Sequence, residues 1–453
     1  MGLGHRFLHK NTDNVLTMVE EVLVPGVKEP TVAWFGPVLM VLIHQPEDLH
    51  VVLNSDQCLS KPYMYRLTRN ETGLFTSKRD DWRLHRRTLN PTFNLKMLMS
   101  FIPTFNEKAR TMVDRMQPDI SKPVDMYRVT FKCLLDMEMN TLLGWESDSQ
   151  NRFGDMLYEN FEEFMKHVTN RLMRFWLKWD WVYRFTDGWR SEMKCYTSGD
   201  GVFKYIRDEK QREFAEKGNI VLDEYRQANM LPWLEKCLLM QQDGKFSNEN
   251  VMDEIYTAFG AGPDTAGSSL MSTLLMLAIH QDIQEKVVAE LREIFDTPDT
   301  PVTYDDIVRM PYMEMVIKEA MRHFPVGPFM MRECDEDLPF RGGVLPKGTN
   351  IGIVTLKVHH DPDIWGPNVD RFYPEHFLPE NVAQRHPCSY LAFSAGKRNC
   401  IAIRYAWFAM KIMLAHLLRR YKFTTDLTYE QIQIKMHLVL RIGNENALSY
   451  VPR

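Results

Sequence analysis

The sequence predicts a mainly α-helical globular protein with small β-sheets. Helical periodicity returns in several segments of the 453 residues, strand-like segments are few and short, and 44% of the residues are hydrophobic, enough for a large core. No Gly/Ser-rich or Pro-rich linker and no internal repeat divides the chain. We therefore expect a single domain, residues 1–453, with a β-rich lobe at about residues 30–60.

Charge and cysteine content exclude several classes of protein. The formal net charge of −5 gives no general attraction for nucleic acid, and we expect no such partner. Seven scattered cysteines without CxxC pairs favour reduced thiols in a cytosol-facing protein over a disulfide scaffold or a zinc finger. No segment approaches the ~18 to 20 apolar residues of a membrane span, so we expect the chain as given to lack a membrane anchor.

The first elements follow from local signals. Residues 31–43, TVAWFGPVLMVLI, are interrupted by Gly36 and Pro37 and predict a hairpin. Pro46 and the acidic residues after it predict a helix start. The aromatic-rich segment within residues 151–240 has helical periodicity and predicts packing between helices rather than a cofactor site.

A long buried helix is predicted next. The turn Asp243-Gly244 and the cap candidate Ser247 open a pattern that runs to about His280 and becomes apolar on nearly all sides. Two shorter helices follow, an amphipathic one beginning near Gln281 and another whose Thr303 and Asp306 have the capping-box order.

Five consecutive residues within the long helix contradict its pattern: Ala261, Gly262, Pro263, Asp264 and Thr265. Glycine and proline cost roughly 1 and 3 kcal/mol inside a helix. Pro263 cannot donate to the carbonyl of Phe259, so we expect a kink. Local violations of this kind often mark functional sites.

Two later features complete the organisation. Glu319 and Arg322 are spaced i, i+3 on a helix and can pair; a surface ion pair is the commoner explanation. Residues 338–356 predict a small sheet, and a proline-rich stretch without periodicity then leads to Phe393.

The stretch FSAGKRNCIAI, residues 393–403, places one cysteine before a helical pattern. Gly396 permits a tight turn. A thiolate at Cys400 would gain from the positive end of the helix dipole, from backbone N–H groups and from Arg398, and we expect all three to lower its pKa. A buried structural thiol is the alternative.

The pattern Phe393-x-x-Gly396-x-Arg398-x-Cys400 resembles the haem-binding loop of the cytochrome P450 superfamily. Further matches occur in the family's order: Trp82 with Arg86, the segment Ala261 to Thr265, Glu319 with Arg322, and Phe372 to Phe377. The resemblance implies the P450 fold, a triangular helical prism with haem between a long central helix and the cysteine loop. The segments WRLHRRTLNPTF, DGKFSNENVMDEI and RYAWFAMKIMLAHLLRRYKF are most similar to the animal microsomal branch, which contains fatty-acid ω-hydroxylases and their insect relatives.

The resemblance also assigns roles. Cys400 would bind the iron of haem (iron protoporphyrin IX), and thiolate ligation favours O–O cleavage. Asp264 and Thr265 would be catalytic and relay protons. The other cofactor-binding residues would be Trp82, Arg86, Arg332 and Arg398 at the propionates, with Ala261, Gly262, Phe393 and Gly396 beside the haem. Glu319, Arg322 and His376 would form a buried structural network.

The sequence departs from the family's pattern at several positions. Ala402 stands where the loop usually has glycine, His376 stands where arginine is frequent, and Pro263 is unusual at its site. Ala261 replaces a glutamate that in some members forms an ester with haem, so that ester is not available here.

As a family member, the protein would insert one oxygen atom from O2 into a lipophilic molecule: a fatty acid, a hormone-like lipid or a xenobiotic. Residues 62–78, 164–175 and 326–331, with Phe259 and Ala261, are candidate pocket walls. Electrons would come from NADPH-cytochrome P450 reductase, with cytochrome b5 as a second candidate, and Lys397, Arg404 and Lys411 are candidate docking charges. We expect peripheral membrane contact at the cytosolic face of the endoplasmic reticulum. The alternative is a haem- or lipid-binding protein of the same fold without turnover.

Overall fold

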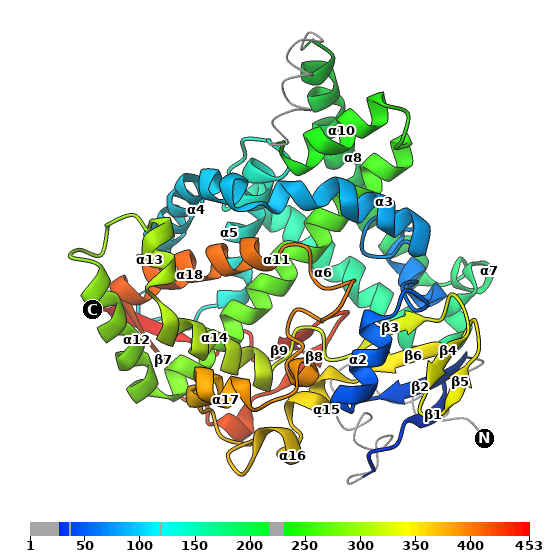
Figure 1. The fold of residues 1–453 in the computed structure, drawn as a ribbon. Coiled ribbons are helices and arrows are strands. Elements are labelled where there is room, and N and C mark those ends of the chain that lie inside the picture. The colour runs from blue at the N-terminus through cyan, green and yellow to red at the C-terminus, as the bar shows by residue number, and fades with distance from the viewer. Residues whose placement is uncertain (1–26, 36–37, 118–119, 217–230) are drawn as a thin grey trace.

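The computed structural model describes residues 27–35, 38–117, 120–216 and 231–453, and these ranges are mainly helical (Figure 1). The α-helices are α2 (Pro46–Asn54), α3 (Arg79–Leu89), α4 (Leu95–Met116), α5 (Met126–Thr141), α6 (Arg152–Met173), α7 (Asp180–Tyr183), α8 (Asp187–Glu216), α10 (Trp233–Gln242), α11 (Asn248–Ile279), α12 (Gln281–Ile294), α13 (Tyr304–Val308), α14 (Pro311–His323), α15 (Thr355–His359), α16 (Pro362–Trp365), α17 (Pro379–Ala383) and α18 (Ile403–Arg420).

Shorter 3-10 helices and strands connect them. The 3-10 helices are η3 (Tyr63–Thr68), η4 (Asn90–Phe93), η6 (Phe175–Lys178), η7 (Pro374–Phe377), η8 (Pro387–Ser389) and η9 (Tyr429–Gln431). The strands are β1 (Thr31–Phe35), β2 (Val38–Ile43), β3 (Met330–Glu333), β4 (Leu338–Phe340), β5 (Gly343–Leu345), β6 (Asn350–Ile353), β7 (Tyr421–Thr424), β8 (Ile434–Met436), β9 (Leu440–Ile442) and β10 (Ser449–Pro452).

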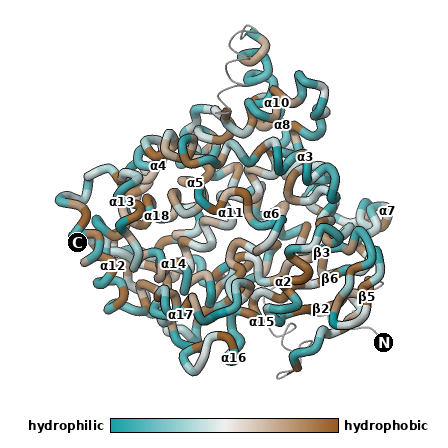
Figure 2. Tube along the Cα trace, viewed as in Figure 1, coloured by the Kyte–Doolittle hydropathy of each residue, from teal (hydrophilic) through white to brown (hydrophobic). Residues whose placement is uncertain are grey.

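Helix α11 crosses the interior and organises the helical part of the molecule (Figure 1). The predicted cap is confirmed: Ser247 and Asn250 form a reciprocal capping box. Nearly every side chain from Ala266 to Ala278 is buried, and the same core includes side chains of α4, α5, α14 and α18. The tube coloured by hydropathy shows mixed stretches on the outer helices, as expected when one face is solvated (Figure 2).

The predicted hairpin is confirmed, and it belongs to a larger sheet. β1 and β2 pair antiparallel, and the strand order is β1-β2-β6-β3. β2 is parallel to β6, with Ile43 opposite Ile353. Strands β3 and β6 thus bring residues 330–353 to the β-rich lobe expected near residues 30–60. Leu49 and Val52 of α2 pack into the same buried cluster as Ile353, so α2 covers this sheet.

One helix expectation needs correction. The helix that begins after Thr303 has the predicted capping box but ends at Val308, and a second helix begins at Pro311, because proline has no N–H to continue the first and fits the first turn of the next. At Pro263, α11 continues without interruption, and the kink expected there stays a prediction. Packing on both sides of this residue maintains α11 although the carbonyl of Phe259 loses its usual donor.

Within the described ranges, no helix combines the length and apolarity needed to span a bilayer. The sequence before residue 27 lies outside these ranges.

Candidate active site

Cys400 differs from every other cysteine of the chain. All seven cysteines lie in the described residues; six are buried, whereas Cys400 is exposed. Yet Cys400 lies deep enough that burial has the largest effect on its pKa. Both observations hold for a thiol that is accessible although protein atoms surround it on most sides. The alternative of a buried structural thiol is therefore wrong for this cysteine.

The loop that presents Cys400 is fixed by backbone contacts. The N–H of Cys400 donates to the carbonyl of Phe393 (3.0 Å), and the N–H of Lys397 donates to the carbonyl of Leu53 (3.2 Å). Gly396 has φ +68°, and a Cβ at this position would overlap the Leu53 carbonyl. Glycine is required here both for its conformation and for this close approach to α2.

The electrostatics of Cys400 differ from the expectation. Burial raises the pKa of the thiol, while the backbone N–H of Ala402 and the charge of Arg86 lower it by less. Arg398 does not act on the sulfur, because its guanidinium is turned towards backbone carbonyls. The thiol is therefore neutral in the ligand-free protein, and a bound metal ion would remove its proton.

Arg86 connects the cysteine loop to α11 through α3. Its guanidinium donates to the carbonyl of Asn399 (2.6 Å) and to the Asn399 side chain (2.8 Å). The neighbouring His85 lies 2.5 Å from Glu254 of α11, and both groups are buried. Helix α3 thus fixes the residue before Cys400 relative to the long helix. The predicted contact of Arg86 with a propionate stays a prediction.

Three buried cations gather beside the loop; we call Lys61, Arg332 and Arg398 the cation cluster. Arg398 donates to the carbonyls of Leu59 (2.5 Å) and Ser77 (3.0 Å). Trp82 belongs to the same region, because its ring centre lies 5.3 Å from the guanidinium of Arg398. Arg332 donates to the carbonyl of Met331 (3.0 Å).

No carboxylate of the described residues pairs with the cation cluster. Lys61 makes neither a hydrogen bond nor an ion pair there; its ammonium lies 4.3 Å from the ring centre of Tyr65. Burial, followed by Arg332, lowers the pKa of Arg398 to about 9, and burial lowers the pKa of Lys61. The acid acting on Arg398, Asp335, accepts from the backbone of Leu59 and Ser60 instead. Burial without a counter-charge disfavours the charged form of these groups, and an anionic ligand would favour it again.

The predicted catalytic segment presents two different faces. Ala261 is exposed and Thr265 partly exposed, whereas Pro263 and Asp264 are buried. The Thr265 hydroxyl donates to the carbonyl of Ala261 (2.7 Å). Residues at i and i+4 share a helix face, so Ala261 and Thr265 line the same side of α11.

Asp264 is held by side chains from two other elements. Its Oδ1 accepts from the Tyr127 hydroxyl (2.7 Å) and from Arg441 of β9 (Nε, 3.0 Å). Arg441 also pairs with Glu162. Oδ2 of Asp264 makes no hydrogen bond to the described part of the chain. Asp264 is therefore an anchored carboxylate with one oxygen still able to accept a proton.

Gly262 meets an unusual neighbour, Glu138 of α5. A Cβ at Gly262 would overlap the Glu138 carboxyl group. Burial raises the pKa of Glu138 well above its usual range, and its Oε2 has no hydrogen-bond partner among the described residues. Glu138 is thus a neutral acid held against the backbone of the catalytic segment.

The predicted network at Glu319 is complete and buried. Glu319 and Arg322 are both 0% exposed and are joined by two hydrogen bonds of 2.9 and 2.8 Å. His376 and the backbone N–H of Tyr373 also donate to Glu319, at 3.1 and 3.0 Å. Arg322 donates to the carbonyl of His359 (2.9 Å). The alternative of a surface pair is wrong, and histidine serves where arginine is frequent.

Four further residues at the site were not found from the sequence: Lys61, Tyr127, Glu138 and Arg441. Their partners lie far away in the chain; Arg441, for example, is 177 residues from Asp264. One expected docking charge is also wrong. Lys411 is buried, donates to the carbonyl of Ile307 (3.0 Å) and lies 2.7 Å from Glu314.

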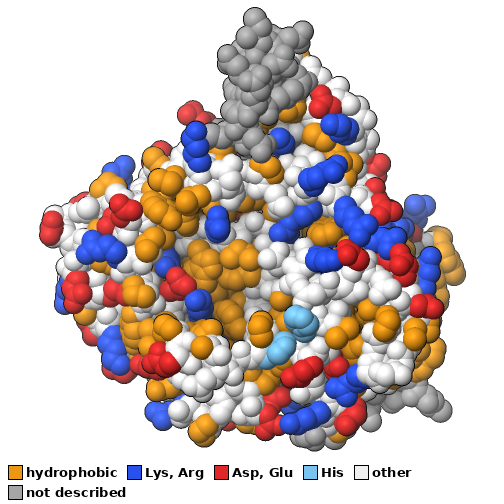
Figure 3. Space-filling model, viewed as in Figure 1, with side chains coloured by type: hydrophobic (Ala, Val, Ile, Leu, Met, Phe, Trp, Pro, Cys, Tyr) orange, Lys and Arg blue, Asp and Glu red, His pale blue; other side chains and the backbone are white. Residues whose placement is uncertain are grey.

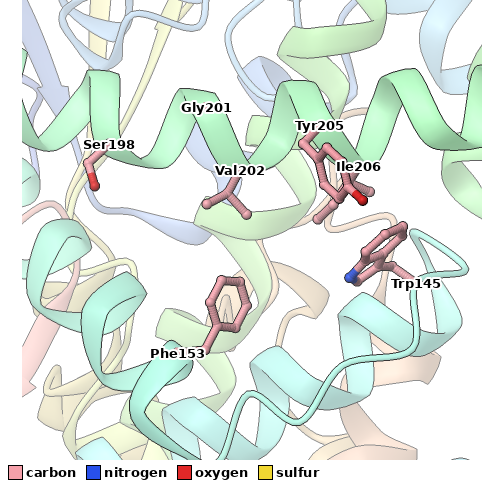
Figure 4. A pocket seen from close by; sticks show the side chains of 7 residues that line it. All are labelled: Trp145, Phe153, Ser198, Gly201, Val202, Tyr205 and Ile206. Atoms are coloured by element: carbon pink, nitrogen blue, oxygen red, sulfur yellow. The ribbon is translucent and has the colours of Figure 1, made fainter.

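The surface adds two observations. On the face shown in Figure 3, hydrophobic side chains gather in a central hollow. A separate pocket of about 440 Å³ lies between α8, the first turn of α6 and the segment after α5, and it is lined mainly by Trp145, Phe153, Val202 and Tyr205 (Figure 4). This second pocket contains none of the predicted site residues.

Comparison with known proteins identifies the family. The cytochrome P450 family model matches residues 29–447. Cytochrome P450 4c21 of Blattella germanica is 30% identical over 456 residues, covering 97% of this chain and 89% of the relative. Cytochrome P450 4V2 of Homo sapiens is 30% identical, covering 91% and 80%, and the probable cytochrome P450 313a4 of Drosophila melanogaster is 29% identical, covering 91% and 84%.

A helical fold whose exposed thiol precedes a helix, together with these matches, defines a haem-thiolate oxygenase. The chain belongs to the cytochrome P450 family, and its relatives confirm the animal microsomal branch predicted from the sequence. It is a monooxygenase of lipophilic substrates, and the family binds haem through a cysteine thiolate.

The residues present fit haem. The group carries two propionates, and the cation cluster supplies buried positive charge without a carboxylate partner among the described residues. Cys400 supplies the soft sulfur donor that suits iron.

Proposed function

We propose that Cys400 binds the haem iron and that the protein inserts one oxygen atom from O2 into a fatty acid or a related lipophilic molecule. The single observation that carries this proposal is the exposure of Cys400, alone among seven cysteines, at the start of α18. The N–H of Ala402 points at its sulfur and would temper the charge of the thiolate. The methyl group of Ala402 leaves this contact intact.

When bound, the haem supplies the oxygen-activating chemistry. The propionates would lie at the cation cluster with Trp82, and Arg86 would hold the cysteine loop through Asn399. Phe393, whose carbonyl accepts from Cys400, and Gly396 would shape the loop around the iron.

Proton delivery is assigned to Thr265 and Asp264. The Thr265 hydroxyl lies on the exposed face of α11 and can exchange its hydrogen bond to Ala261 for one to a substrate or water. Asp264 can take up a proton at Oδ2 while Arg441 and Tyr127 keep Oδ1 fixed. Gly262, pressed against Glu138, permits this close packing behind Thr265.

A lipophilic substrate suits the aromatic side chains that pack against α11. Phe259 packs against Phe203 with ring centres 4.7 Å apart, and against Phe161 at 5.5 Å. Of the other predicted walls, residues 62–78 are tied to α11 by the contact of Asn70 with Asp253 (3.0 Å). The side chain of Phe175, at the end of another predicted wall, lies outside the described residues.

Partners and location follow the family. NADPH-cytochrome P450 reductase would supply electrons, with cytochrome b5 as a second donor, at the cytosolic face of the endoplasmic reticulum. Exposed aromatic side chains support a peripheral membrane contact: Trp181 is 70% and Phe185 84% exposed, and Trp34 of β1 is exposed as well. Leu172, near the end of α6, packs against the sheet cluster that contains Met40 of β2. The segment after α6, which carries Trp181 and Phe185, therefore starts beside the sheet that carries Trp34.

The test is reconstitution with NADPH, the reductase and a panel of fatty acids. We expect hydroxylated product from the wild type, a strong loss of product with Thr265→Ala, and loss of the reduced CO-bound thiolate-haem spectrum with Cys400→Ser. A Cys400→Ser protein that keeps an unchanged spectrum would refute the iron assignment. Intact haem without turnover on any substrate would favour the binding protein without catalysis.

A further inference from the structure

Two cysteines outside the active site touch each other. Cys58 follows α2 and Cys334 follows β3, 276 residues further along the chain. Their sulfur atoms are 4.0 Å apart, and each residue is 1% exposed. Among all seven cysteines, which the structure describes in full, this is the single cysteine pair in hydrogen-bonding contact. The other buried thiols, such as Cys133, have other neighbours.

The two backbones that carry this pair are already fixed. The N–H of Glu333 donates to the carbonyl of Ser60 (2.9 Å), and the N–H of Asp335 donates to that of Gln57 (2.7 Å). The Asp335 carboxylate accepts from the N–H groups of Leu59 and Ser60, both at 3.0 Å. A disulfide requires an S–S distance of about 2.05 Å, so closing the gap is a matter of side-chain rotation and a small backbone shift.

The two thiols also differ in acidity. Their mutual hydrogen bond raises the pKa of Cys58 and lowers the pKa of Cys334. Arg332 lies close enough to oppose the rise at Cys58. Either sulfur can donate this hydrogen bond, so either can attack an oxidant, and the other thiol then lies beside it as the resolving group.

We propose that Cys58 and Cys334 form a redox-active dithiol that hydrogen peroxide converts to a disulfide. The thiolate of one cysteine attacks one oxygen of the peroxide, the O–O bond breaks, and the departing hydroxide takes the proton released by that thiol to become water. The sulfur of the other cysteine then attacks the sulfur of the resulting sulfenic acid, the S–S bond forms as the S–O bond breaks, and the hydroxide leaves as a second water with the remaining thiol proton. The two sulfurs lose two electrons in total and the peroxide gains them.

The position of the pair gives this modification a consequence. The bond would join the segment after α2 to the end of β3, and these same segments carry Leu59, whose carbonyl binds Arg398, and Arg332. Oxidation therefore adds a covalent link to the hydrogen bonds that already join the two sides of the cation cluster. Closing so long a loop also restricts the unfolded chain, so the oxidised protein unfolds at a higher temperature.

The experiment treats the full chain with hydrogen peroxide and maps its peptides without reduction. We expect a linked pair of peptides containing residues 58 and 334, lighter than the separate thiol peptides by two hydrogen atoms and separable by dithiothreitol. Because both thiols are buried, we expect this product to form more slowly than the oxidation of an exposed thiol.

Matched variants make the result specific. Cys58→Ala removes the partner, and Cys133→Ala removes a buried cysteine without a cysteine neighbour. The linked peptide and the reversible rise in unfolding temperature should persist in Cys133→Ala and vanish in Cys58→Ala. If Cys58→Ala does not fold, Cys334→Ala serves the same purpose. Peptides linked through other cysteines alone, or oxyacids at residues 58 and 334 without a link, would overturn the proposal whatever the activity of the haem site.

Discussion

Two buried charged regions flank the cysteine loop, and they differ in whether their charges are balanced. Around Glu319, one carboxylate receives hydrogen bonds from Arg322, from a histidine and from backbone N–H. In the cation cluster, Lys61, Arg332 and Arg398 have no carboxylate partner among the described residues. The balanced region is suited to stability, and the unbalanced one to binding an anion, because burial penalises a charge only until a counter-charge arrives.

Removing Glu319 should have the largest effect. Glu319→Ala leaves the Arg322 guanidinium buried without its partner and should lower the free energy of unfolding by about 3 to 5 kcal/mol. Urea unfolding of the haem-free protein measures this. Asp187→Ala, which removes the acid of the exposed i, i+3 pair with Arg190, is the control and should change little. Equal effects of the two variants would contradict the distinction between buried and surface pairs.

Glu138 is a buried acid whose Oε2 has no hydrogen-bond partner among the described residues, and it tests the case in which burial keeps a group neutral instead of charged. Gly262→Ala should destabilise the protein by about 1 to 3 kcal/mol, because the added methyl group overlaps the Glu138 carboxyl group. Glu138→Ala makes room, so the same glycine substitution in that background should cost much less. A double-mutant cycle on the free energy of unfolding checks this, and purely additive effects would show that the two residues do not meet.

The pH dependence should follow the buried histidines near the balanced network. Burial lowers the pKa of His359 to about 3, and its Nε2 lies 2.8 Å from the N–H of Leu391 as an acceptor. Since the unfolded chain binds this proton near pH 6.5, stability falls as pH drops from 6.5 towards 3, by about 1.4 kcal/mol per pH unit for each such histidine. Between pH 6.5 and 5, His359→Gln should reduce the slope of the free energy of unfolding against pH by the contribution of one histidine. An unchanged slope would mean that His359 is not confined in its neutral form.

Glu319 contributes in the same direction at lower pH. Burial alone would raise its pKa, but hydrogen bonds from His323, His376 and Arg322 outweigh burial and hold the pKa below its usual range. Its stabilisation is therefore complete above the unfolded carboxyl pKa, near 4, and disappears only below it.

Local signals predicted much of this molecule. The Ser247 cap, the strands on either side of Gly36 and Pro37, and the helical spacing of Glu319 and Arg322 depend on residues close together in the chain, where propensity and periodicity are informative. The cysteine loop could also be recognised from the sequence, because its residues, including Gly396 and Cys400, lie close together in the chain.

The missing parts depend on contacts between distant segments. Nothing near Asp264 in the sequence indicates Arg441, and nothing near Gly262 indicates Glu138. Lys411 was misplaced because a lysine on an amphipathic helix is usually solvated, whereas here Glu314 and a carbonyl hold it inside. The expectation of a lowered Cys400 pKa counted the helix dipole but not the burial that outweighs it.

Lys61 gives the smallest but most direct test of the comparison. Its ammonium is buried, makes no hydrogen bond within the described residues and faces the rings of Tyr65 and Phe75 at 4.3 and 5.4 Å. Lys61→Met keeps the length of the side chain and removes the charge. In the haem-free protein this should raise the free energy of unfolding by on the order of 1 kcal/mol, because the cost of confining the cation disappears.

The same substitution should have the opposite effect on haem. With one of three cations gone, the propionates lose part of their counter-charge, and a haem titration should show about tenfold weaker binding, equivalent to ~1.4 kcal/mol. Lys166→Met, at an exposed lysine, should alter neither quantity. A Lys61→Met protein that is less stable without haem and binds haem as before would show that Lys61 stabilises the fold, as the Glu319 network does, and does not contribute to haem binding. A gain in stability with a loss in affinity is the pattern of a charge retained for its ligand rather than for the fold.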